Sequence, residues 1–285
     1  MTAAIEPGAP NAGWRLLRFA GKDSDMILRT LGAATLIACV SVVPTAAQER
    51  PPRIVTLGLG VQMRPGYPGA DNLRLAPLPV VRVRREGQPI PLRAPDDGAT
   101  IRAIGSEFGW SAGGTFNFQG DREDEDVGAA VGDVGFTVEP GLFVQGYLRP
   151  DIRFRAEGRR GVGGHDAFTG DVSLDYVLRT PGDRFVGSIG PRVRLGDARY
   201  QRAYFGVTDD AAVATRLPAY RPGGGLHATG VAAGGLYQFN ERWGVFAYAG
   251  YDRLVGDAAD SPLVRRFGSR DQASGGIALT YTFRP

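Results

Sequence analysis

The sequence predicts an all-β protein, an antiparallel transmembrane β-barrel of about twelve strands (ten is the alternative count), preceded by a cleaved signal peptide. Strand-length segments alternate between apolar and polar residues, and an export signal precedes them. The last segment, 272–283, alternates with period two and ends in aromatic residues. One of its faces carries Ile277, Leu279, Tyr281 and Phe283. In a closing barrel strand this apolar face meets lipid and the opposite face lines the lumen.

The chain divides into three parts. Residues 1–25 are interpreted as a mis-assigned start or an N-terminal extension, 26–47 as the signal peptide and 48–285 as the barrel. The signal has a basic start, an apolar run too short to span a bilayer, and small residues that favour cleavage after Ala47. Lipidation at Cys39, within a loosely matching lipobox, is the alternative.

Composition narrows the function classes. Cys39 is the only cysteine, so the barrel has no disulfide or thiolate metal site. The net charge of +3 does not indicate a nucleic-acid partner, and we expect no cofactor. The 42 glycines suit a tightly curved sheet. Mean hydropathy of −0.15 is compatible with a barrel, because only alternate residues meet lipid.

Alternation predicts the strands in order. The alternating segments are 53–63, 73–85, 107–118, 136–148, 152–159, 171–178, 185–195 and 272–283. Aromatic residues near strand ends, such as Tyr237, Phe239 and Trp243, suit an interfacial girdle. A soluble periplasmic β-sandwich also alternates, but it buries its apolar faces in its own core. The export signal and the closing strand favour the barrel.

The connections alternate in length, as in outer-membrane barrels with short periplasmic turns and long outer loops. Short turns lie at 149–151, 181–183 and 240–242, and longer segments at 119–134, 195–225 and 255–270. Because both ends of the barrel domain start in the periplasm, an even number of strands must precede 107–118.

The segment 88–105 decides the strand count. Asp97-Gly98 suits a hairpin tip, whereas three prolines weaken the first arm. We favour an extra short hairpin, which gives twelve strands. A long irregular turn, which gives ten, is the alternative.

Several stretches carry a family resemblance in order and spacing. They are residues 66–72 (Gly-Tyr-Pro-Gly-Ala-Asp-Asn), 75–79, 122–126, 163–166, 204–208, 217–220, 256–264 and 268–270. In these stretches the chain resembles the MipA/OmpV outer-membrane proteins, although it ends Phe283-Arg284-Pro285 rather than on the aromatic residue. The resemblance implies an outer-membrane barrel. It also implies a scaffold role for a murein-cleaving lytic transglycosylase and a bifunctional penicillin-binding protein, while other members resemble adhesins or envelope stress factors.

Charged residues dominate the predicted lumen. The inward-facing candidates are Arg74, Arg82, Arg84, Glu139, Arg153, Arg155, Glu157, Arg159, Asp171, Asp175, Arg192 and Arg194. We favour mutual pairing in a narrow barrel, because unpaired buried charge is costly. A ring of arginines that selects anionic solutes is the alternative.

The long loops hold a second set of candidates. They are Asp124, Asp126, His165, Tyr204, Phe205, Tyr220, Asp257 and Asp260. The acidic run 121–126 lacks the spacing of an EF-hand, which favours a solvated loop over a calcium site. The aromatic and Arg residues of 195–225 fit a binding surface or an inward plug equally well.

No nucleophile motif accompanies the two histidines, His165 and His227, so we expect no enzyme activity. We expect a monomer in the outer membrane, in contact with lipid and lipopolysaccharide. The leading hypothesis is the scaffold. A narrow solute channel with an Arg-lined lumen and a surface adhesin are alternatives, and a membrane-embedded hydrolase is the least favoured.

Overall fold

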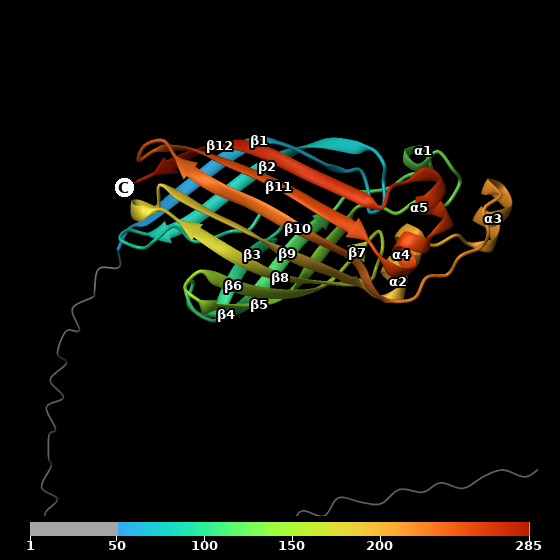
Figure 1. Cartoon of the computed structure of the whole chain (residues 1–285), viewed down its shortest axis with the longest axis horizontal. Helices are drawn as coiled ribbons and strands as arrows, with labels where there is room; N and C mark the ends of the chain where they lie inside the picture. Colours follow the sequence, from blue (N-terminus) through green and yellow to red (C-terminus); the bar gives the residue numbers. More distant parts are fainter. Residues whose placement is uncertain (1–50, 285) are drawn as a thin grey trace, which may run out of the picture. The chain divides into compact units, whose positions relative to one another are not determined.

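The computed structural model describes residues 51–284, which form one curved antiparallel sheet (Figure 1). The strands are β1 (Arg53–Pro65), β2 (Leu73–Arg85), β3 (Ala99–Gly105), β4 (Ser111–Gln119), β5 (Thr137–Arg149), β6 (Ile152–Arg160), β7 (Val162–Gly163), β8 (Phe168–Arg179), β9 (Phe185–Gly196), β10 (Gly225–Gln238), β11 (Trp243–Leu254) and β12 (Asp271–Phe283). The helices are α1 (Asp124–Val127), α2 (Ala198–Phe205), α3 (Asp209–Thr215), α4 (Gly256–Asp260) and α5 (Pro262–Phe267), with a 3-10 turn at Pro181–Asp183.

The pairing order is β2-β1-β12-β11-β10-β9-β8-β6-β5-β4-β3. The two-residue strand β7 pairs only with β5, which makes it a short continuation of β6. This confirms an antiparallel barrel of about twelve strands. The closing strand is also confirmed, because β12 pairs with β1 from Val55↔Phe283 to Met63↔Gly275.

Strands β2 and β3 end the pairing order and do not pair with each other within the described residues. Proline suits an edge strand because it has no N–H to donate to a neighbouring strand. Strand β2 contains Pro77 and Pro79, which lie opposite Val61 and Leu59 of β1. Its position at the edge therefore agrees with its sequence.

The outward face of the wall is apolar. Leu59, Leu75 and Leu142 are each about 70% exposed, on the faces that alternation predicts. Tyr281 packs edge-on against both Trp243 and Phe283, with ring centroids 4.9 and 4.8 Å apart, as in the predicted girdle. Such an exposed apolar surface suits lipid contact. In the part of the chain that the structure describes, no helix has the length and hydropathy of a membrane span.

The two ends of the barrel differ (Figure 1). The loop end carries all five helices, on the three long connections that the sequence predicts. The turn end carries the short turns and the C-terminal end of β12.

The segment between β2 and β3 corrects the predicted hairpin. Its second arm forms β3, but residues 88–98, here called the inner segment, form no strand. Its apolar side chains, Ile90, Leu92 and Ala94, are buried. The physical reason is that Pro89, Pro91 and Pro95 have no N–H for a ladder. Strand parity requires the chain to cross back from the turn end to the start of β3. The inner segment makes this crossing inside the lumen and not as a strand of the wall.

Candidate functional site: a filled lumen

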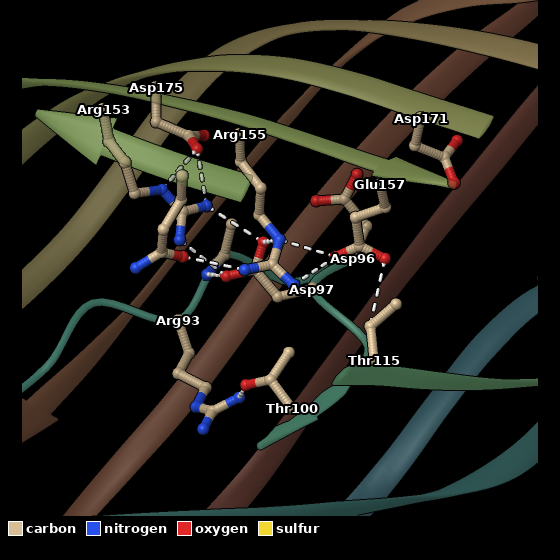
Figure 2. A network of polar contacts seen from close by, with 12 residues as sticks. Arg93, Asp96, Asp97, Thr100, Thr115, Arg153, Arg155, Glu157, Asp171 and Asp175 are labelled. Carbon is tan, nitrogen blue, oxygen red and sulfur yellow. Dashed lines mark hydrogen bonds and ion pairs between the residues drawn. The ribbon is translucent and has the colours of Figure 1, made fainter. Parts of the chain in front are cut away.

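An ionic layer of arginines and carboxylates lies inside the lumen, and the buried Arg153 joins two of its carboxylates (Figure 2). Its Nη1 and Nη2 donate to the two oxygens of Asp97 at 2.7 and 2.9 Å. Its Nε and Nη2 donate to Asp175 Oδ2 at 3.1 and 2.7 Å, and Asp175 Oδ1 accepts from Arg192 at 2.8 Å. A wall arginine of β6 therefore holds both a wall carboxylate and a carboxylate of the inner segment.

The neighbouring residue Asp96 anchors the inner segment to β9. Arg192 Nε donates to both Asp96 oxygens at 3.0 and 2.8 Å, and Arg194 Nη2 reaches Asp96 at 3.3 Å. Arg194 also donates to Asp171 at 3.1 Å and to Asp252 at 2.8 Å. The adjacent carboxylates Asp96 and Asp97 thus join the inner segment to arginines of β6 and β9, two strands that lie far from the inner segment in sequence.

A second group of ion pairs lies closer to the loop end. Arg159 donates to Glu139 at 3.0 Å and to Glu157 at 2.8 Å, and it also pairs with Asp171. Arg155 pairs with Glu157. Most of the inward-facing candidates are therefore mutually paired, as the favoured interpretation expects, because these buried charges compensate one another.

The two histidines lie under the loop-end helices. His165 is buried, and its Nε2 is 2.9 Å from Glu139 Oε1. Its ring packs edge-on against Tyr200 at 5.3 Å, and the Tyr200 ring lies 5.0 Å from that of His227. Within residues 51–284 neither histidine hydrogen-bonds a serine side chain.

The loop-end helices form a cap over the lumen with an apolar core. Tyr204 and Phe205 of α2 are 0% exposed. Ser261 Oγ donates to the Phe205 carbonyl at 2.7 Å, which ties α2 to the start of α5. Burial raises the pKa of the Tyr204 phenol well above its ordinary value, so this group stays neutral. Tyr204 and Phe205 are therefore part of an inward plug and not of an exposed binding surface.

An apolar layer fills the lumen nearer the turn end. Ile90 and Leu92 of the inner segment pack there with inward side chains of the wall. These wall residues are Leu78, Val80, Val177, Val186, Leu236, Phe246 and Ala278. Arg82 donates to the Pro91 carbonyl at 2.8 Å and lies over the Phe246 ring. The lumen is therefore filled in three layers: the cap, the ionic layer and the apolar layer.

Besides Arg82 of the apolar layer, two inward-facing candidates lie outside the ionic layer. Arg74 is half-exposed at the loop end and pairs with Asp126 and, at 3.5 Å, with Asp121. Arg84 lies near the turn end and donates to the Gln88 carbonyl at 2.8 Å.

The acidic run 121–126 serves the local backbone. Asp124 Oδ1 accepts from the Val131 and Gly132 amides at 2.8 and 2.7 Å. Glu123 and Asp126 form a capping box at α1. Nowhere between residues 51 and 284 do three or more potential metal-ligating side chains form a cluster. These carboxylates therefore shape the cap.

The remaining loop candidates also make contacts within the cap. Tyr220 donates to the Asp257 carbonyl at 3.0 Å, and Asp257 Oδ2 accepts from the Gly223 amide at 2.8 Å. Asp260 pairs with Arg265 at 2.7 Å. The contacts of Asp257 join the connection 197–224 to α4, and the Asp260–Arg265 pair joins α4 to α5.

Sequence reasoning missed the inner segment as a contributor to the lumen. Asp252 of β11 was not among its candidates. Asp96 and Asp97 were also left out, because they were assigned to a hairpin tip, which projects from a sheet. Their signal was the pair of carboxylates beside three prolines, a composition that disfavours a wall strand.

The wall, its apolar outer face and its filled lumen define a β-barrel of the outer-membrane class. The particular family is MipA, described as MltA-interacting protein MipA: its sequence model matches residues 57–283, and the chain belongs to this family. No curated protein matches the chain.

Solved structures show weak likeness to this chain. A "CymD monoaromatic hydrocarbon channel" has 10% identity and a TM-score of 0.29, with 80% of this chain and 87% of that chain covered. A Pseudomonas aeruginosa FadL homologue has 11% identity and a TM-score of 0.29, with 82% and 90% covered. The outer membrane protein OprG from Pseudomonas aeruginosa has 10% identity and a TM-score of 0.21, with 83% and 98% covered. At these values the likeness assigns no function or substrate.

Proposed function

We propose that this chain is a monomeric, non-enzymatic outer-membrane scaffold for peptidoglycan-remodelling enzymes. Its partners are a lytic transglycosylase and a bifunctional penicillin-binding protein, bound by its outer surfaces. The observation that carries the proposal is the filled lumen. Because ion pairs and apolar side chains occupy the lumen, the surfaces left for binding are the two ends and the lipid-facing wall. The name of the family supports an interaction role.

The turn end is the proposed contact surface, since short turns face the periplasm in outer-membrane barrels. Its turns expose basic side chains. Arg149 is 74% exposed at the turn between β5 and β6, and Arg242 is exposed at the turn between β10 and β11. A partner must therefore lie flat against this rim, and a rim with exposed arginines favours an acidic patch on that partner.

Charge reversal at the rim tests the proposal. The test variant combines Arg149→Glu with Arg242→Glu. The matched control is Arg221→Glu at the loop end, where Arg221 is 72% exposed. Binding of both purified enzymes to the detergent-solubilised barrel is measured by biolayer interferometry. We expect the rim variant to lose at least about tenfold in affinity and the control to bind like the wild type. Absence of binding to the wild type, or an equal loss in both variants, would reject the scaffold.

The solute channel is less favoured because the arginines of the ionic layer are paired with carboxylates. We expect no steady conductance in planar bilayers. Stable anion-selective openings that Arg194→Ala reduces would instead support the channel.

The adhesin is the second candidate, and a feature of α3 favours it. This helix projects furthest at the loop end in Figure 1, and its Val213 is 84% exposed. Binding of cells to immobilised host-surface glycans, compared between the wild type and Val213→Asp, tests this candidate. A loss in the variant would favour the adhesin over the scaffold.

A further inference from the structure

A polar cavity of about 180 Å³ lies between the inner segment and the wall strands β3 to β6. Arg93 and Asp97 line it from the inner segment, and Ser111 and Arg155 from the wall. Glu107 of the turn between β3 and β4 also lines the cavity and is about one-third exposed, which places the mouth at the turn end. The ionic layer and the cap close the other side.

Arg93 differs from the arginines of the ionic layer. Its Nη1 donates to Thr100 Oγ1 at 2.6 Å, and it forms no ion pair with any residue between 51 and 284. Figure 2 shows its side chain reaching towards Thr100, away from Arg153 and Asp175. Nearby, the buried Arg82 donates only to a carbonyl, and its Nε has no partner in the described structure. Arg82 and Arg93 therefore have no carboxylate partner among residues 51–284.

Two neutral groups in the lining are also available to a ligand. Ser111 is 4% exposed, and its Oγ has no hydrogen-bond partner among the described residues. Gln145 accepts from Arg155 Nη1 at 2.7 Å through Oε1, so its amide N–H groups remain as donors. Buried polar groups without partners are costly unless a ligand or water satisfies them.

We propose that this cavity binds a small α-amino acid from the periplasmic side. The carboxylate of the ligand takes the free guanidinium of Arg93 and the Ser111 hydroxyl. The ammonium group takes Glu107 at the mouth, where Glu107 Oε2 also pairs with Arg102 of the lining. Guanidinium forks match carboxylates well. The lining sets Asp97 and Glu107 against Arg93, Arg102 and Arg155, and this small positive balance suits one carboxylate better than a multiply charged phosphate. The volume is about six times the ~30 Å³ that a water molecule occupies in the liquid, which limits the ligand to small side chains. This binding activity is separate from the scaffold role.

Calorimetric titration of the purified protein in detergent tests the proposal with alanine, propionate and inorganic phosphate as probes. We expect alanine to bind more tightly than propionate, and phosphate to bind weakest. Arg93→Gln should lower the affinity for alanine at least about tenfold, because it removes the charge-assisted hydrogen bonds. Arg149→Gln, an exposed arginine of the turn end outside the lining, is the matched control and should leave the affinity unchanged.

Arg93→Gln should fold, since the Arg93 side chain makes no ion pair and only one hydrogen bond, to Thr100, within residues 51–284. Heat-modifiable migration in electrophoresis checks folding, and Ser111→Ala provides a second variant that removes no charge. Absence of alanine binding to the folded wild type would overturn the proposal. Equal affinity in wild type, Arg93→Gln and Ser111→Ala, or tighter binding of phosphate than of alanine, would overturn it as well.

Discussion

The cap and the inner segment both close the lumen, but they use different physical interactions. The cap has short helices and an apolar core to which α2, α4 and α5 contribute. The inner segment has no regular structure and is held by ion pairs at Asp96 and Asp97 and by arginines that donate to its carbonyls, such as Arg179 to Ile90 at 2.7 Å. Apolar packing therefore spreads the stability of the cap over many residues, whereas the inner segment concentrates its polar anchoring on Asp96, Asp97 and a few carbonyls.

The largest expected effect follows from Asp97→Ala. This change leaves Arg153 and Arg155 without one of their buried partners, and removing one member of a buried ion pair costs about 3–5 kcal/mol. We expect the inner segment to leave the lumen and trypsin to cleave after Arg93. Urea unfolding and mass spectrometry of the fragments measure both effects. The control is Asp209→Ala, whose carboxylate is 72% exposed. Wild-type stability in Asp97→Ala would contradict the ionic anchor.

A smaller effect is expected for Leu263→Ala in the cap. Leu263 is 2% exposed in the core, and a buried Leu→Ala change costs about 2–5 kcal/mol in free energy of unfolding, at the lower end where neighbouring side chains can close the space. Proteolysis should then begin at Arg265 and Arg266 of α5 rather than at Arg93. If Leu263→Ala instead exposed Arg93 to trypsin, the cap and the inner segment would unfold as one cooperative unit and would not be independent closures.

Next comes Ser261→Ala at the start of α5. The Ser261 side chain accepts from the Leu263 and Val264 amides and donates to the Phe205 carbonyl. Loss of such an N-cap costs about 1 kcal/mol. Hydrogen exchange of the α5 amides should rise, while exchange in the inner segment stays at the wild-type rate. Ser261→Thr, which keeps the hydroxyl, should retain most of the protection.

The smallest effect is the pH dependence of the cap. The hydrogen bond from Arg74 lowers the pKa of Asp126 in α1, with a further contribution from the Glu123 amide. A carboxyl whose pKa is lowered on folding contributes stability that is present above its unfolded pKa of about 4 and is lost as the pH falls through the folded value. Exchange of the α1 amides should therefore rise below about pH 4. Asp126→Asn should remove this dependence, and an unchanged profile would exclude Arg74–Asp126 as its source.

Sequence reasoning recovered the wall well because alternation is local. The outward faces of β1, β2 and β5 follow directly from residues two apart, and a slip by one residue would turn every apolar side chain inward. The pairing of β12 with β1 follows from the same pattern at the two ends of the barrel domain. The hairpin at 88–105 failed because turn propensity at Asp97-Gly98 was outweighed by the prolines before it and by arginines more than 50 residues away.

The antiparallel barrel, its outward apolar faces and its long and short connections follow from the sequence alone, which also favours pairing of the inward charges. Each of these depends on spacing along one strand or on the balance of charge. Only the tertiary structure decided which carboxylate meets which arginine, that residues 88–98 enter the lumen, and that His165, Tyr204 and Phe205 lie inside the cap. These contacts join strands and loops far apart in the chain, so they depend on the strand register and curvature of the complete wall, which no local pattern encodes.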